Sequence, residues 1–467
     1  MKKSILLSLI FSLGCLNPLS GQQIKPFQTG DRVTFVGNSI THGGRYHSYI
    51  WLYYMTHFPN EPMWMANCGV GGDTSKEIYE RLDSDVFAKR PTVLTLTFGM
   101  NDSGYFEYNG NSPEKFGDRQ VEKARANFVR IVKKLQDHKN VRVIMIGTSP
   151  YDQTSKFNKD VYKNKNNYIQ KMIAFQDSTS RANKWEFLDF NAPMLKINSE
   201  QQAKDSTFTI CGNDRIHPDN DGHMVMAYLF LKAQGFVGQK VADVKINARN
   251  NKVLKSDNCI ISNIEKTKGN LSFNYFAKSL PFPLDTIAHG WMAKRSASLA
   301  AKYIPTFMKD IDEENLSVTG LKGTYRLTID GVLVDTLSAQ KLAAGINLAL
   351  YRQTPEYQQA LTISALNEDR LEIEAKFRDY AWIQYDYFMP LGLLNVNDEH
   401  AAQVFRKGVG TNGWVSARKE LYDKMIHKDV RDMMVAQMDM LVKKIYEINK
   451  PKTRKVKLTL VNINKVL

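Results

Sequence analysis

The 467-residue chain is poor in cysteine and in long apolar runs. If the first 21 residues are removed, three cysteines remain: Cys68, Cys211 and Cys259. An odd number of cysteines argues against a complete disulfide framework. Beyond the N-terminus, no segment is apolar enough to cross a bilayer. No cluster has the ligand spacing of a zinc or calcium site and no phosphate-binding glycine loop occurs, so we predict no metal and no cofactor.

Residues 1–21 have the character of a bacterial secretory signal peptide. Two lysines precede an apolar run of about ten residues, which is too short to span a membrane. Two processing sites compete. Cleavage after Gly21 would give a secreted or periplasmic protein, which is the form we expect. The alternative is a lipoprotein anchored through Cys15, although Ser12 stands where such a box usually has leucine.

Length and charge set further bounds. A chain of 467 residues exceeds one ordinary core, so two domains are expected. The net charge is +15, and the segment 406–457 holds 14 Lys and Arg against 6 Asp and Glu. No nucleic-acid-binding module accompanies this excess, so we predict no nucleic-acid partner. The basic segment is either a solvated face or a surface for an acidic polysaccharide.

The segment 22–238 alternates between strand-like and helix-like patterns. Such alternation predicts a parallel sheet covered by helices on both faces, with ligands bound outside the carboxyl ends of the strands. The expected strands are 32–37, 63–69, 92–99, 141–147 and 185–190, and the expected helices lie near 45–58, 75–89, 119–138, 160–183 and 221–234.

The segment 239–467 lacks the regular alternation of strand and helix patterns. We predict that it forms a C-terminal, mostly β domain that carries a helical insertion near 397–448. Asp330-Gly331 is typical of a tight hairpin turn within 323–337. The other expected strands are 258–266, 270–277, 370–377 and 454–461, with further helices near 286–311 and 354–367.

Polar residues with catalytic potential follow several of these strands. Ser39 comes directly after the first strand, in "VGNSIT". A serine nucleophile needs a base and groups that stabilise the oxyanion. The segment "CGNDRIHPDNDGH" places Asp214 three residues before His217, so that one loop can present a histidine and the carboxylate that orients it. The loops "GVGGDTS" and "FGMND" could offer a backbone N–H and the Asn101 amide.

These four segments together resemble the sequence blocks of the SGNH subgroup of the GDSL esterase/lipase family, over roughly 30–235. The resemblance implies a flavodoxin-like three-layer α/β/α domain. It implies that Ser39 is the nucleophile, His217 the base and Asp214 the residue that orients it. The oxyanion hole would consist of the Ser39 and Gly72 backbone N–H groups and the Asn101 side chain. Gly72 is preferred to its neighbour because it directly precedes the Asp-Thr pair.

One residue departs from the family pattern. Asn38 stands where the first block has aspartate, which is not the triad acid, so the mechanism is retained while a negative charge beside Ser39 is lost. Asn38 is also the one feature that favours a catalytically weakened hydrolase acting as a binding or scaffold protein. His42 and Arg45 follow closely and are either substrate-facing or ordinary loop residues.

The resemblance leaves the leaving alcohol open. A lipase or lysophospholipase would usually carry an apolar lid, and no long amphipathic apolar segment lies near the site loops. We therefore expect a carbohydrate esterase that removes acetyl groups from an acylated polysaccharide or oligosaccharide. Trp291, Trp382 and Trp414 are candidates for a sugar platform, although core packing explains them equally simply.

Overall fold

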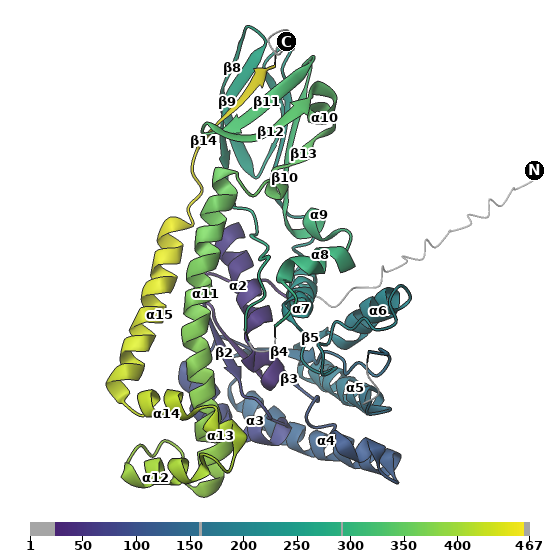
Figure 1. Ribbon diagram of the computed structural model, residues 1–467, viewed down its shortest axis with the longest axis vertical. Helices are drawn as coiled ribbons and strands as arrows, with labels where there is room; N and C mark the ends of the chain where they lie inside the picture. Colours follow the sequence, from purple (N-terminus) through teal and green to yellow (C-terminus); the bar gives the residue numbers. More distant parts are fainter. Residues whose placement is uncertain (1–23, 158–160, 291–292, 462–467) are drawn as a thin grey trace, which may run out of the picture.

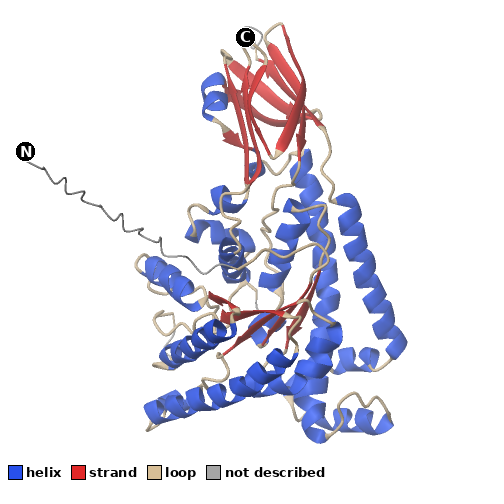
Figure 2. Ribbon diagram, turned by 180° about the vertical axis from the view of Figure 1, so that it is seen from behind, coloured by secondary structure: helices blue, strands red, loops and turns tan. Residues whose placement is uncertain are grey.

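The computed structural model describes residues 24–157, 161–290 and 293–461. The predicted signal peptide, with Cys15, lies outside the described residues. Figure 1 and Figure 2 show a long molecule, with a helix-covered parallel sheet at one end and a β-sandwich at the other. Among the helices of the described ranges, none is long and apolar enough to cross a membrane.

The N-terminal sheet has the strand order β2-β1-β3-β4-β5, and all its neighbouring strands are parallel. This is the flavodoxin-like order, so the predicted fold class is confirmed. The five expected strands are present within two residues of their predicted ends. They are β1 (Arg32–Gly37), β2 (Trp64–Gly69), β3 (Val93–Phe98), β4 (Arg142–Gly147) and β5 (Glu186–Asp189).

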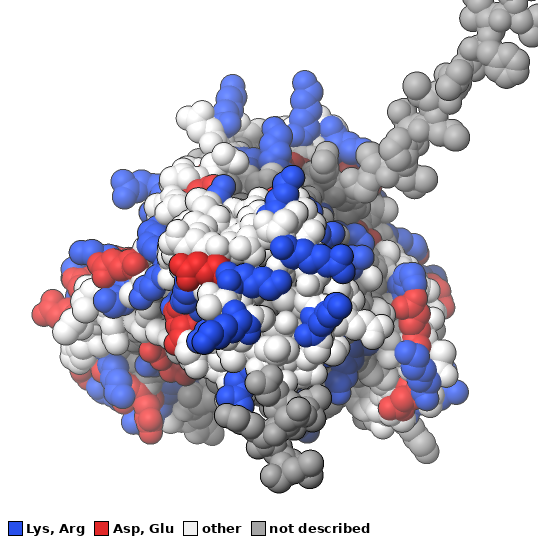
Figure 3. Space-filling view, turned by 90° about the horizontal axis from the view of Figure 1, so that it is seen from above, with Lys and Arg blue, Asp and Glu red and all other residues white. Residues whose placement is uncertain are grey.

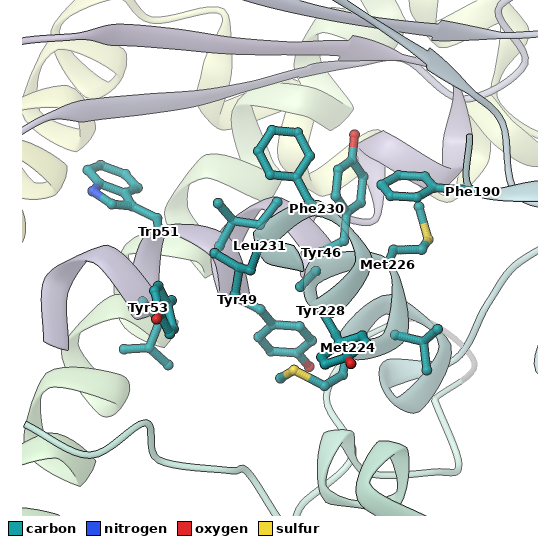
Figure 4. Packing of buried hydrophobic residues seen from close by; sticks show 14 of the residues in the cluster. Tyr46, Tyr49, Trp51, Tyr53, Phe190, Met224, Met226, Tyr228, Phe230 and Leu231 are labelled. Atoms are coloured by element: carbon teal, nitrogen blue, oxygen red, sulfur yellow. The ribbon is translucent and has the colours of Figure 1, made fainter. Parts of the chain in front are cut away.

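Helices cover both faces of this sheet, because successive strand side chains point to opposite sides. Val33 and Phe35 of β1 pack toward α2 and α7, and Figure 4 shows the aromatic and methionine side chains of that layer. Leu94 and Leu96 of β3 pack toward α3, α4 and α5. The helices are α1 (Ser39–His42), α2 (Arg45–His57), α3 (Ser75–Arg81), α4 (Pro113–Asp137), α5 (Lys165–Asn183), α6 (Asn191–Gln202) and α7 (Asn220–Ala233), of which α1 and α6 were not predicted.

The second β region is a sandwich of two sheets, ordered β13-β10-β6-β7 and β12-β11-β14-β9-β8. The last strand, β14, lies between β11 and β9, so the chain returns to the sandwich after a long helical excursion. Asp330 and Gly331 form the predicted hairpin turn with φ of 50° and 85°. The strands are β6 (Lys240–Asn247), β7 (Lys252–Asp257), β8 (Cys259–Thr267), β9 (Asn270–Ala277), β10 (Glu313–Thr319), β11 (Thr324–Ile329), β12 (Val332–Ser338), β13 (Ile346–Asn347) and β14 (Arg454–Leu460).

The predicted strand at 370–377 is wrong, because these residues lie inside α11, a helix of 28 residues. Of the described residues in the region expected to be helical, 286–311, only those from 297 onward contain helical turns. The predicted insertion near 397–448 is helical. These helices are α8 (Ala300–Tyr303), α9 (Phe307–Ile311), α10 (Ala339–Ala344), α11 (Pro355–Trp382), α12 (Glu399–Gly408), α13 (Gly413–Ser416), α14 (Lys419–Met425) and α15 (Lys428–Ile448).

Helix α11 runs from the sandwich along the side of the parallel sheet, next to α15 (Figure 1). It covers the edge strand β2 with polar side chains. The Asn67 backbone N–H donates to Glu374 Oε1 at 2.9 Å, and Arg378 Nη1 donates to the Asn67 carbonyl at 3.1 Å. Two side chains therefore supply two of the hydrogen bonds that a further strand would make at this edge.

The helical segment also shares a core with the N-terminal half. Ala360 and Ile363 of α11 and Ile445 of α15 belong to the same buried cluster as α2 and α7. The division of the chain at residue 238 stays a prediction, because packing of this kind joins segments on both sides of it.

Candidate active site

Ser39 lies at the sharp turn between β1 and α1. Asn38 is the N-terminal cap of α1, and its Oδ1 accepts a hydrogen bond from the Ile40 backbone N–H at 3.1 Å. A Cβ atom on Gly37 would lie 2.2 Å from Thr41 Oγ1, so only glycine fits there. Asn38 thus keeps the capping function without adding a charge next to Ser39.

His217 and Asp214 form a hydrogen-bonded line with Ser39. His217 Nε2 lies 2.8 Å from Ser39 Oγ, and His217 Nδ1 lies 2.5 Å from Asp214 Oδ2. The second Asp214 oxygen accepts from the backbone N–H groups of Ile216, at 3.0 Å, and His217, at 2.9 Å. Burial opposes ionisation of Asp214, but the bonds from His217 and the backbone outweigh it and lower the carboxyl pKa.

The loop that carries this pair is held by tight backbone geometry. Gly212 has φ of 74°, and a Cβ atom there would lie 1.9 Å from the His217 carbonyl oxygen. Arg215, which is 1% exposed, donates through Nη1 to the carbonyls of Asp152 and Ser155, both at 3.0 Å. These contacts therefore hold the loop that carries Asp214 and His217 in one conformation.

The glycine turn predicted to supply an oxyanion donor lies against Ser39. A Cβ atom on Gly71 would lie 3.8 Å from Ser39 Cβ, which places the glycine turn against the serine. The Gly71 N–H donates to His42 Nδ1 at 3.2 Å, whereas the Gly72 N–H donates to no group in the described chain. Gly72, with φ of 93°, is therefore the glycine of this turn with a free donor.

Asn101 is fixed next to the same turn. Its Nδ2 donates to the Asp73 carbonyl at 2.9 Å, and its Oδ1 accepts from the Tyr105 hydroxyl at 2.5 Å. One amide hydrogen thus remains for a ligand. Asp102 holds the loop in place by accepting from the backbone N–H groups of Ser75, at 2.8 Å, and Gly99, at 3.0 Å.

A small pocket of about 80 Å³ opens beside Ser39 and His217. Part of its wall comes from His289, Gly290 and Ala293, which lie outside the family-like half of the chain. The Asn220 amide exchanges two hydrogen bonds with the His289 backbone, both of 2.9 Å. Arg45 also lines the pocket and donates through Nη1 to both Glu368 carboxylate oxygens, at 2.7 and 2.6 Å. A larger cavity of about 470 Å³, beside His57 and Lys278, contains none of the predicted site residues.

His223, which also lines the pocket, is buried. Burial lowers the His223 pKa to about 3, so its ring stays uncharged. The three described cysteines, Cys68, Cys211 and Cys259, are free and buried. Within the described ranges, no group of three or more His, Cys, Asp or Glu residues could hold a metal ion.

Comparison with known proteins agrees with this geometry. A model of the GDSL-like lipase/acylhydrolase family matches residues 35–225. A solved structure of a gut microbial diltiazem-metabolizing enzyme is 52% identical, covers 94% of this chain and 100% of that chain, and superposes with a TM-score of 0.93. The chain belongs to the GDSL-like lipase/acylhydrolase family. It is an SGNH ester hydrolase with added β and helical regions.

Two further comparisons each cover a part of the chain. A model described as the diltiazem deacetylase C-terminal helical domain matches residues 361–450 of this SGNH hydrolase. The chain is also similar to the acetylxylan esterase Axe2 from Geobacillus stearothermophilus, at 21% identity over 45% of this chain and 96% of that chain, with a TM-score of 0.35. No curated protein matches the chain.

Sequence reasoning missed the contribution of α11 to the site. His42 Nε2 lies 3.5 Å from Asp379 Oδ1, and Glu368 orients Arg45. Both acidic residues lie more than 300 positions from their partners, and neither belongs to a family block. Trp382 is buried, whereas Trp414 is 59% exposed, and Arg418 lies over both rings. Trp291 lies outside the described residues.

Proposed function

We propose that the protein is a serine acetyl esterase in which Ser39 forms the acyl-enzyme. The line from Asp214 through His217 to Ser39 carries the proposal. His217 takes the Ser39 proton as Oγ attacks the ester carbonyl, and it returns that proton to the leaving alcohol. A water molecule, deprotonated by His217 in the same way, then releases the acid. Asp214 keeps the His217 Nδ1–H in place and stabilises the imidazolium that forms.

The oxyanion of each tetrahedral intermediate would be held by the Ser39 and Gly72 backbone N–H groups and the Asn101 amide. Preorganised donors of this kind stabilise the charge that develops in the transition state. Support comes from the Gly72 N–H, which is unused in the described chain, and from Asn101, which is fixed by Asp73 and Tyr105.

The acyl group that we propose is acetyl. The pocket beside Ser39 is small, and the 52% identical structure is that of a diltiazem-metabolizing enzyme. The match of 361–450 to a diltiazem deacetylase helical domain supports the same acyl group. We propose an acetylated polysaccharide or oligosaccharide as the natural substrate of a secreted protein. Figure 3 shows exposed Lys and Arg over the sandwich end, which would favour an acidic glycan.

Acetate release by the purified protein tests the proposal. We expect turnover of 4-nitrophenyl acetate to exceed that of the octanoate ester, and Ser39→Ala to abolish it. Parallel assays with acetylated xylo-oligosaccharides and with diltiazem compare the two kinds of leaving alcohol. A preference for the octanoate would favour the lipase-type alternative. Full activity in Ser39→Ala, with an unchanged circular-dichroism spectrum, would exclude the serine mechanism.

A further inference from the structure

A second histidine–carboxylate pair lies on the other side of Ser39. His42 ends the helix that Ser39 begins, and its two ring nitrogens face different parts of the molecule. Nδ1 accepts the hydrogen bond from the Gly71 N–H at 3.2 Å, and Nε2 lies 3.5 Å from Asp379 Oδ1 on α11. The pair therefore spans the distance between the glycine turn and the helical region at 361–450.

The contacts of the ring fix its tautomer. Gly71 needs a lone pair on Nδ1, so the single proton of the neutral imidazole must be on Nε2. An ionised carboxylate is an acceptor only, and Asp379 thus matches a protonated Nε2. Burial, partly offset by Asp379, lowers the pKa of His42, which keeps the ring neutral. A proton on Nδ1 would point at the Gly71 N–H and would break this hydrogen bond.

The helical region holds Asp379 in turn. Arg418 Nη2 lies 2.7 Å from Asp379 Oδ1, and the Arg418 guanidinium is 4.4 Å from the centre of the Trp382 ring. These three residues all lie within 361–450, the segment that matches the helical-domain model. A chain of contacts thus runs from this segment through His42 to the turn that carries Gly72.

We infer that His42 and Asp379 are positioning residues that hold the Gly71–Gly72 turn so that the Gly72 N–H points at the substrate oxyanion. The inference rests on the proposed function. Neither residue lines the pocket beside Ser39, and they would act through the orientation of one peptide group. The helical region would thereby be part of the catalytic unit, with a role in turnover rather than in substrate affinity.

Three substitutions separate the two contacts. His42→Leu removes both ring nitrogens. His42→Asn keeps an acceptor near the position of Nδ1 but cannot reach Asp379. Asp379→Asn can present an amide N–H to Nε2 and so permits the wrong tautomer. Complete loss of an oxyanion donor lowers kcat about 10²–10³-fold, so we expect about 10–100-fold from His42→Leu and about 3–10-fold from Asp379→Asn.

The kinetic signature distinguishes positioning from general destabilisation. With 4-nitrophenyl acetate, kcat should fall in His42→Leu while KM stays within about twofold, and His42→Asn should recover most of kcat. Asp369→Asn, on an exposed part of the same helix, is the matched control and should leave kcat and Tm unchanged. Wild-type kcat in His42→Leu, or a loss confined to KM, would overturn the inference.

Two more measurements distinguish a failure of this inference from a failure of the proposed function. Diethyl 4-nitrophenyl phosphate should modify Ser39 more slowly in His42→Leu, because Oγ attacks phosphorus, 4-nitrophenolate leaves and the phosphoryl oxygen needs the same donors. An equal rate of modification would contradict the inference. If the wild-type protein hydrolyses no ester, the proposed function fails, and a crystal structure of His42→Leu still decides the inference. An unmoved 70–73 turn would overturn it, and a displaced turn would support it.

Discussion

Carboxylates beside the strand ends of the parallel sheet differ in their surroundings from those at the base of the β-sandwich. Asp85 is 4% exposed and pairs with Arg81 at 2.7 Å, Arg378 at 3.0 Å and Lys89 at 2.6 Å. Burial alone would raise its pKa, but the three cations hold the pKa well below its ordinary value. Asp214, which is bonded by backbone N–H groups and His217, also has a lowered pKa.

At the base of the sandwich the same residue types meet few positive charges. Asp312 accepts from the Phe282 N–H at 2.8 Å, and burial raises its pKa well above the ordinary value. Glu314 accepts from the Tyr275 hydroxyl at 2.7 Å, and burial together with the nearby Glu356 raises its pKa. Burial is therefore outweighed at Asp85 and Asp214, where cations and donors converge, and it prevails at Asp312 and Glu314.

The largest effect in this comparison of carboxylate surroundings is expected at the Asp214–His217 pair. His217→Ala should lower kcat/KM for 4-nitrophenyl acetate at least about 10⁴-fold, since the proposed base is lost. The loss of kcat/KM in Asp214→Asn should be smaller than the loss in His217→Ala by about 10–100-fold, because a poorly oriented histidine still accepts a proton. His400→Ala, at an exposed position, is the control. Equal losses of kcat/KM in both site variants would mean that Asp214 is as important for turnover as His217.

Removal of one cation from Asp85 should destabilise the fold. Arg378→Met leaves a buried carboxylate with two of its three partners and also leaves the Asn67 carbonyl unpaired. We expect the free energy of unfolding in urea to fall by about 3–5 kcal/mol. Lys376→Met, on the exposed side of α11, should change it by less than about 0.5 kcal/mol. Similar losses of unfolding free energy in Arg378→Met and Lys376→Met would mean that Arg378 does not stabilise the buried Asp85 carboxylate.

Glu314→Gln should have the opposite effect at the sandwich base. The unfolded chain releases the Glu314 proton above about pH 4.3, whereas the folded protein keeps it because the folded pKa is raised. The unfolded state then binds fewer protons, so wild-type stability falls as the pH rises. Glutamine removes this loss, which is at most about 1.4 kcal/mol per pH unit.

Tm measured at pH 5, 6.5 and 8 tests this expectation. The advantage of Glu314→Gln over the wild type should grow with pH. Glu372→Gln, an exposed glutamate on α11, should show no such trend. A constant difference across the range would mean that Glu314 is ionised in the folded protein.

The smallest effect is expected from a charge added beside Ser39. Asn38 is 1% exposed, and Asn38→Asp would place a carboxylate at the N-terminus of α1. If it is ionised, it favours the imidazolium form of His217 and moves the acid limb of the kcat/KM profile to higher pH, by about one unit or less. A pH–rate profile of both proteins on one acetate ester measures the shift. No shift, or one to lower pH, would leave Asn38 with a structural role alone.

Much of the N-terminal half was predictable because its elements have strong local patterns. The five strands are short apolar runs that end in glycine or polar residues, and the site segments follow them directly. The geometry brings Ser39, Asp214 and His217 together and places Gly72 and Asn101 beside them. Their catalytic roles stay predictions until the variants are measured.

Helix α11 shows why the rest was not predictable. The segment 370–377 alternates between apolar and polar residues, which is typical of a strand. In the folded protein the buried face of α11 includes the charged side chains of Arg370, Glu374 and Arg378. Glu374 and Arg378 bond to groups far away in the sequence, and Arg370 pairs with Glu374 one turn along the helix. A hydrophobic pattern cannot reveal charged side chains on a buried face. The link from Asp379 to His42 was missed for the same reason.

The cover that α11 provides for β2 also has a consequence for the order in which the nascent chain can fold. Asn67 and Glu374 are separated by 307 positions. At about 5–20 residues per second, roughly 15–60 s of translation pass between the synthesis of the strand and that of the helix. During that interval the hydrogen-bonding edge of β2 has no partner from its own chain, and it could pair with a strand of another molecule. The growing polypeptide would therefore keep this pairing edge uncovered until α11 emerges.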